Sequence, residues 1–145
     1  MNSELLSQIA ITLVPNIGNV QAKILLNHFG DASSVFKAKK SELEKLEGVG
    51  EVRAKSIKQF NDFARAEQEL KFIEKNKIKT LFLTGGDYPK RLINCYDSPT
   101  LLFYKGEADL NASKIVAIVG TRSNTDYGKQ FTEKLVKDLS VTKIS

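Results

Sequence analysis

The stretch "LEGVGEVRAKSI" (residues 46–57) decides the fold of the first half of the chain. A degenerate copy, "VPNIGNVQAKIL", occupies residues 14–25, at an offset of 32 positions. Apolar residues with helical spacing lie before and after the central turn of each copy. The repeat therefore predicts two hairpins, each made of a helix, a tight turn and a second helix.

The turn residues have a conformational reason. A sharp link between helices needs a positive φ, which glycine adopts freely and asparagine tolerates. We therefore expect Asn16 and Gly48 to occupy one such position, and Gly18 and Gly50 the other. Amides exposed at the turn and at the start of the following helix can then bind an anion.

The repeat resembles the helix-hairpin-helix motif, h-x-G-h-G-x-x-x-A, which binds the DNA backbone without reading its sequence. The second copy matches the motif well, and the first copy is degenerate. This predicts an auxiliary nucleic-acid contact at Gly48, Gly50, Arg53 and Lys55. The alternative is a compact helical domain in which the hairpins only pack.

Local signals define the elements between the repeat and the end of the chain. Ser41 and Glu44 have the spacing of a capping box that opens the helix before the second turn. The segment 62–79 predicts a further helix that ends near Asn76, a residue suited to a left-handed helix C-terminus.

Two short runs, "TLFLT" (80–84) and "LLFYK" (101–105), have the composition and flanking turns of strands. Their aromatic residues Phe82 and Phe103 are expected in the core. We place the change of domain within the helix before them, which gives a helical domain at 1–66 and a second domain at 67–145.

The segment "KIVAIVGTRSNTDYG" (114–128) predicts a strand, a loop and the start of a helix. "KIVAIV" is a continuous β-branched run, typical of a strand buried on both faces. Phe131, Leu135 and Leu139 follow at every fourth position, as on an amphipathic helix. The loop matches neither of the two common nucleotide-binding loops. It lacks the second glycine of the dinucleotide-binding motif G-x-G-x-x-G and the GK[ST] ending of the nucleoside-triphosphate loop.

The loop instead offers hydroxyl groups, helix N-terminal amides and the guanidinium of Arg122, a set that suits a phosphate group. The alternative is structural: Thr125 or Asp126 caps the helix, and Arg122 pairs with a carboxylate.

Over essentially its whole length, the chain resembles the DprA/Smf family of DNA-processing proteins, which also begins with a small helical domain. The resemblance rests on "VAIVGTRSNTDYG" (116–128), preceded by Tyr88-Pro89, Leu92, "DSP" (97–99) and "LLFYKG" (101–106). It implies an α/β fold: a tandem helix-hairpin-helix (SAM-like) domain followed by the first part of an extended Rossmann-like domain, truncated at residue 145. The phosphate-binding loop of the family maps onto Gly120, Thr121, Arg122, Ser123, Thr125, Tyr127 and Gly128.

The same resemblance implies a function. Members bind single-stranded DNA, protect it and help load the RecA recombinase in natural transformation, and they are not known as enzymes. We therefore expect no cofactor, and a homodimer whose contacts lie beyond residue 145. Two other classes stay open: a Rossmann-type nucleotide-phosphate hydrolase, and a protein-binding module without DNA contact.

Composition agrees with these expectations without deciding among them. The 145 residues carry a formal net charge of +5, and a single cysteine and a single histidine do not suffice for a Cys/His metal cluster. No apolar run approaches the length of a membrane span, and no secretory signal is evident. We therefore expect a cytoplasmic protein.

Overall fold

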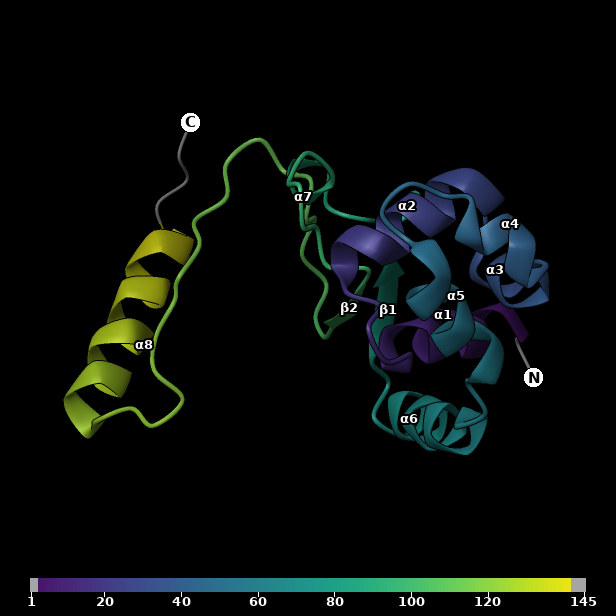
Figure 1. The fold of residues 1–145 in the computed structure, drawn as a ribbon. Helices are drawn as coiled ribbons and strands as arrows, with labels where there is room; N and C mark the ends of the chain where they lie inside the picture. The colour runs from purple at the N-terminus through teal and green to yellow at the C-terminus, as the bar shows by residue number, and fades with distance from the viewer. Residues whose placement is uncertain (1–2, 142–145) are drawn as a thin grey trace. The chain divides into compact units, whose positions relative to one another are not determined.

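The computed structural model describes residues 3–141, and its contacts separate two compact units, Met1–Ala112 and Ser113–Ser145. The first unit consists of helices and one small sheet, and the second holds a single described helix (Figure 1). The elements in chain order are α1 (Ser3–Leu13), α2 (Asn19–Phe29), α3 (Ala32–Lys37), α4 (Lys40–Glu44), α5 (Gly50–Gln59), α6 (Phe63–Lys75), β1 (Lys79–Phe82), α7 (Lys90–Ile93), β2 (Leu101–Tyr104) and α8 (Asp126–Val141).

Both predicted hairpins form. The first is α1, a turn and α2, and the second is α4, a turn and α5. Positive φ angles occur at Asn16 (65°), Gly48 (83°) and Gly50 (65°). Gly18 is the exception, because it caps α2 in an extended conformation with φ −94°. The prediction of a positive φ is therefore confirmed at three of the four turn positions and wrong at Gly18.

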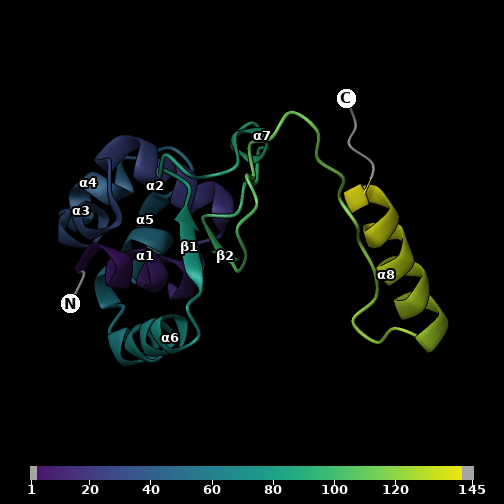
Figure 2. The ribbon, with the colours of Figure 1, turned by 180° about the vertical axis from the view of Figure 1, so that it is seen from behind.

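Two hydrophobic clusters hold the first unit together. The larger one joins the two hairpins through fully buried side chains such as Leu25, Leu43 and Ile57. The smaller one lies between α1 and α6, where Ile9 and Leu70 are buried. Both ribbon views show α6 alongside α1 (Figures 1 and 2).

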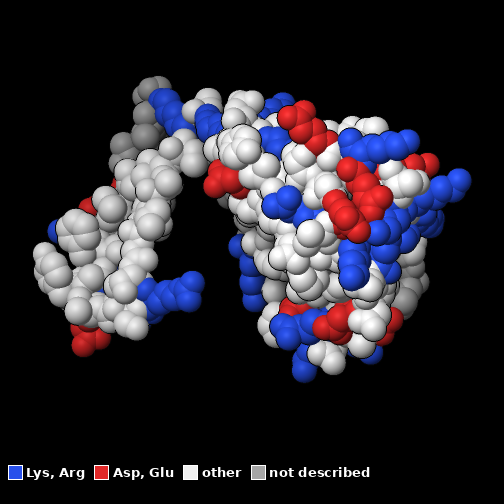
Figure 3. Space-filling model, in the orientation of Figure 1, with Lys and Arg blue, Asp and Glu red and all other residues white. Residues whose placement is uncertain are grey.

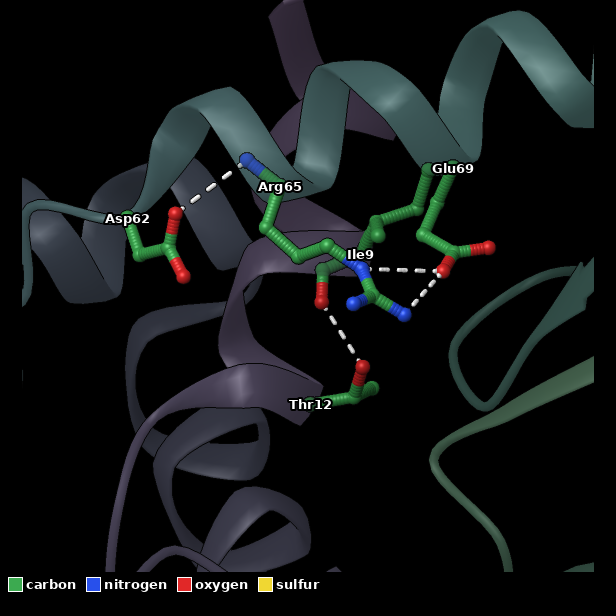
Figure 4. A network of polar contacts seen from close by, with 5 residues as sticks. All are labelled: Ile9, Thr12, Asp62, Arg65 and Glu69. Atoms are coloured by element: carbon green, nitrogen blue, oxygen red, sulfur yellow. Dashed lines mark hydrogen bonds and ion pairs between the residues drawn. The ribbon is translucent and has the colours of Figure 1, made fainter.

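The start of α6 is held by polar contacts on its exposed side. The carboxylate of Asp62 accepts a hydrogen bond from the Arg65 amide at 3.2 Å, which is a side-chain N-cap. Farther along, the Arg65 guanidinium contacts Glu69 at 2.7 Å, one turn on, while Thr12 of the neighbouring α1 donates to Ile9 (Figure 4). The residues of α6 that pack in the smaller cluster are Ala66, Leu70 and Ile73.

Of the two helix-end predictions, the capping box at Ser41 and Glu44 is wrong and the end of α6 near Asn76 is confirmed. Helix α4 starts at Lys40, and its reciprocal cap is the Lys39 amide donating to Glu42 at 2.8 Å, so Ser41 and Glu44 lie inside the helix. Helix α6 does end before Asn76, but the positive φ falls on Lys77 (52°).

Strands β1 and β2 pair antiparallel, with Lys79 opposite Tyr104 and Phe82 opposite Leu101. Phe82 is buried as predicted, whereas the prediction is wrong for Phe103, which is 58% exposed. The domain boundary predicted after Ala66 stays a prediction. In the structure, α6 and the sheet belong to the same compact unit as the hairpins.

The second unit departs from the predicted strand–loop–helix. Residues 114–119 form no strand, and Ile115, Val116, Ile118 and Val119 are between 46% and 92% exposed. A strand exists only by pairing, and the described part of this unit contains no second strand. The parallel Rossmann-like sheet is thus not confirmed, whereas the amphipathic helix is, with α8 beginning at Asp126.

Candidate nucleic-acid interface

The turn of the second hairpin is held to the hydrophobic core by a buried side chain. The side chain of Val49 is 2% exposed and fixes the turn to the core. A Cβ atom at Gly48 would lie 2.9 Å from Cδ1 of Ile24, so both its φ and its surroundings require glycine. The amide of Gly50, at the start of α5, has no acceptor among the described residues. An anion approaching the N-terminus of α5 therefore meets a free N–H group.

Arg53 and Lys55, both predicted to contact nucleic acid, have different surroundings. The Arg53 guanidinium donates from Nε to the Asn16 carbonyl at 3.1 Å and from Nη1 to the Gly48 carbonyl at 3.3 Å. Arg53 thus ties the two hairpin turns together, with some of its five N–H groups still unused. Lys55 is exposed and makes no hydrogen bond or ion pair within residues 3–141.

The loop before α8 is capped in the way that the structural alternative predicts. The Thr125 hydroxyl accepts a hydrogen bond from the Gly128 amide at 3.1 Å, and the Thr125 backbone carbonyl accepts one from the Lys129 amide at 3.0 Å. The Thr121 hydroxyl accepts a further bond from the Ser123 amide at 3.3 Å. Thr125 therefore has a capping role, which occupies the hydroxyl but not the other amides of the first turn.

A cavity of about 440 Å³ lies between this loop and the first two turns of α8. Four of the seven predicted loop residues line it: Gly120, Thr121, Thr125 and Gly128. The other three, Arg122, Ser123 and Tyr127, lie outside the lining, and the exposed Tyr127 ring stacks on Phe131. The structure thus brings together the two glycines and the two threonines of the motif and leaves its arginine outside the lining.

The cavity also contains residues that the loop motif did not indicate: Asn124, Lys129, Thr132 and Glu133, besides the apolar Ile118 and Val119. Three of them follow Thr125 at four, seven and eight positions, which is one face of a helix. Helical spacing counted from the cap would have found Lys129, the cation of this lining.

Charge gives a modest general attraction for a polyanion. On the face of the first unit seen in Figure 3, acidic and basic side chains are interspersed. A net charge of +5 favours nucleic acid over long range without defining a site.

No group of three His, Cys, Asp or Glu side chains suited to a metal ion occurs within the described residues 3–141. None of the helices described there is long and apolar enough to cross a membrane.

Known proteins resemble both parts of the chain. Residues 79–145 match the family model of DNA recombination-mediator protein A, and residues 9–69 match that of the helix-hairpin-helix motif. The chain is 34% identical, over 95% of its length, to protein Smf of Synechocystis sp.. Shorter matches occur with the DNA processing protein DprA of Bacillus subtilis (40% identical over 43% of the chain) and of Streptococcus pneumoniae (38% over 46%).

These matches span a minor part of each relative: 36% of the Synechocystis protein, and 21% and 23% of the two DprA proteins. No solved structure matches the chain.

Proposed function

Because the chain belongs to the DprA/Smf family of DNA-processing proteins, we propose that it binds single-stranded DNA through the backbone phosphates. In this proposal the intact protein shields the strand, helps load a RecA recombinase, acts as a homodimer in the cytoplasm and carries out no catalytic step. Strand binding is the first of these activities, since shielding the strand and loading the recombinase both require it.

One observation carries the proposal: the predicted loop and the start of α8 form an open pocket lined by glycines, hydroxyl groups and a lysine, with one carboxylate, Glu133, at its α8 side. The absence of a Cβ at Gly120 leaves open space around that backbone, so a phosphate could approach closely. The positive end of the α8 dipole and the amides of its first turn favour an anion there. Arg122, in the same loop but outside the lining, adds a planar, permanently charged fork.

The second hairpin adds an auxiliary contact to the proposal. Its free Gly50 amide and the exposed Lys55 favour a phosphate without reading bases. In this role Gly48 shapes the turn, and Arg53 holds the turn to its neighbour through the Asn16 carbonyl.

Replacement of Arg122 by alanine in the intact protein tests the main site. A charge-assisted hydrogen bond contributes about 1.5–3 kcal/mol, so binding to single-stranded DNA should weaken roughly tenfold to a hundredfold. The loss should be similar for different base sequences, and Arg122→Lys should recover only part of it. Fluorescence anisotropy with a labelled oligonucleotide measures both variants.

The matched control is Lys134→Ala, which removes an exposed charge of α8 outside the cavity. We expect its affinity to stay within about twofold of the wild type, as for one screened surface charge. Wild-type binding by folded Arg122→Ala would show that this loop is not the DNA site.

A further inference from the structure

The segment Tyr88–Thr100 contains motif residues to which the proposed function gives no role. It folds as a compact unit around α7. Tyr88 is 1% exposed, and its hydroxyl donates to the Pro99 carbonyl at 2.6 Å. The fully buried Ser98 hydroxyl lies within hydrogen-bond distance of the carbonyl oxygens of Leu92 and Cys95. These contacts turn the segment back on itself.

This segment rests on the first hairpin. The Lys23 ammonium of α2 donates to the carbonyls of Ile93 at 2.7 Å and Cys95 at 2.9 Å, and lies 3.3 Å from the Ser98 hydroxyl. At the beginning of α2, the amide oxygen of Asn19 accepts from both the amide and the hydroxyl of Thr100, each at 3.3 Å. The side chains of Asn19 and Lys23 on α2 are therefore both held by the 88–100 segment.

In the first hairpin turn, the backbone amide that precedes α2 also has a hydrogen-bond acceptor. The Gly18 amide donates to Oε1 of Gln21 at 3.2 Å. In the second hairpin the corresponding residues are Gly50 and Arg53, and Arg53 donates to carbonyls instead of accepting from the amide. At this position the two hairpins differ: the Gly18 amide has a side-chain acceptor, whereas the Gly50 amide has none among the described residues.

The lysines of the repeat show the same contrast. Lys23 has three partners, whereas its counterpart Lys55 is exposed and has none within residues 3–141. Next to Lys55, one turn back, Val52 is 70% exposed. Among the described residues, the second hairpin combines an amide without an acceptor and a lysine without a partner, whereas the lysine of the first hairpin is held.

We propose that the two hairpins have divided roles: the first positions the Tyr88–Thr100 segment, and only the second meets nucleic acid. This inference rests on the proposed function. It implies that the helical hairpins contact one phosphate of one backbone strand, whereas two available hairpins could bridge two strands. Their contribution should consequently be the same for single-stranded and duplex DNA.

Lysine acetylation of the wild-type intact protein, read by mass spectrometry, tests the division without a mutation. Lys55 should react readily in the free protein and be at least about threefold protected by an excess of a thymidine 20-mer, as expected for a phosphate-contacting lysine. Lys23 should react slowly with or without DNA, because its ammonium is held by carbonyl oxygens. Lys71, exposed on α6, should react equally in both states and serves as the control.

Substitutions give an independent measurement. Lys55→Gln should weaken binding to the 20-mer and to a 20-base-pair duplex by the same factor, about twofold to tenfold, and lower the single-strand salt slope by about 0.7. Lys23→Gln should lower the unfolding temperature and leave the salt slope of the folded protein unchanged.

Protection of Lys23 by DNA, or a lower salt slope in folded Lys23→Gln, would overturn the division. Failure of DNA to protect Lys55 would overturn it as well, while leaving the proposed function to the Arg122 variants. Absence of binding by the wild-type protein to either DNA would instead refute the proposed function itself.

Discussion

At the scale of single residues, two carboxylates hold the start of α3. Glu4 of α1 accepts hydrogen bonds from the amides of Ala32 and Ser33, at 3.0 and 3.1 Å. Asp31 accepts from the amide of Ser34 at 2.7 Å and from its hydroxyl at 2.8 Å. The first three amides of this six-residue helix are thereby satisfied, and one of the acceptors comes from another helix. The cap therefore also fixes α3 against α1.

The Asp31 cap predicts a pH-dependent stability. The hydrogen bonds from Ser34 lower the pKa of the Asp31 carboxyl below its ordinary value of 3.8, and nearby Lys37 acts in the same direction. Because the folded pKa is the lower one, the contribution is fully present above pH 3.8 and is lost as the pH falls through the folded pKa. Asp31→Ala should destabilise the chain by about 1 kcal/mol at neutral pH.

Asp31→Asn is the matched control, because asparagine also caps helices but does not titrate. In urea unfolding at a series of pH values, the wild type should lose its advantage over Asp31→Asn below pH 3.8. An advantage independent of pH would assign the effect to side-chain shape.

At the scale of elements, the second hairpin turn depends on the positive φ of Gly48. Gly48→Ala should destabilise the chain by about 1–3 kcal/mol, from a strained backbone and from the approach of its Cβ to Ile24. Gly48→Asn should cost less, because asparagine tolerates this conformation, as Asn16 shows in the first turn with φ 65°. Chemical denaturation measures the difference, which isolates the backbone contribution.

Gly86→Ala is the control for that pair. A Cβ at Gly86 meets nothing within 4 Å and its φ is not positive, so we expect a change within about 0.5 kcal/mol. Equal losses for Gly48→Ala and Gly48→Asn would mean that contact with Ile24, and not φ, sets the requirement.

The hairpins could be predicted from the sequence because helix periodicity and turn chemistry are local. The positions of Asn16 and Gly48 in their turns follow from a repeat visible in the letters alone. What could not be predicted is which copy is free: Lys23 and Lys55 are equivalent in sequence, and they differ only through a segment about 70 residues away. The prediction of a strand at residues 114–119 was wrong for the same reason, since a strand depends on partner strands that its own residues do not specify.

The candidate site was predictable in part. Its glycines and hydroxyls belong to one local motif, and the structure gathers Gly120, Thr121, Thr125 and Gly128 around one cavity. Lys129 was missed, although helical spacing from Thr125 would have indicated it. The position of Arg122 outside the lining depends on the path of the loop, which residue types do not determine.

At the scale of the whole molecule, the two units differ in buried apolar surface. The first unit contains both hydrophobic clusters, whereas every residue from Ser113 to Tyr127 is exposed. Opening of the chain in that stretch breaks few tertiary contacts, and its backbone has no helix or strand before α8. The segment 113–125 is therefore where the free energy of local opening should be lowest.

Limited proteolysis of the 145-residue chain tests this difference. Trypsin should cut first after Lys114 or Arg122, because local unfolding there requires little free energy. It should cut later after Lys90 and Arg91, where the Lys90 amide donates to Asn111 at 2.8 Å and the Arg91 guanidinium donates to Ala112 at 2.9 Å.

The N-terminal product should unfold with a free energy within about 0.5 kcal/mol of the uncut chain, because few contacts are lost. Mass spectrometry identifies the cuts, and urea denaturation followed by circular dichroism measures the stability. A first cut inside α2 to α6, or an N-terminal product that does not unfold cooperatively, would show that residues 3–112 are not an independent unit.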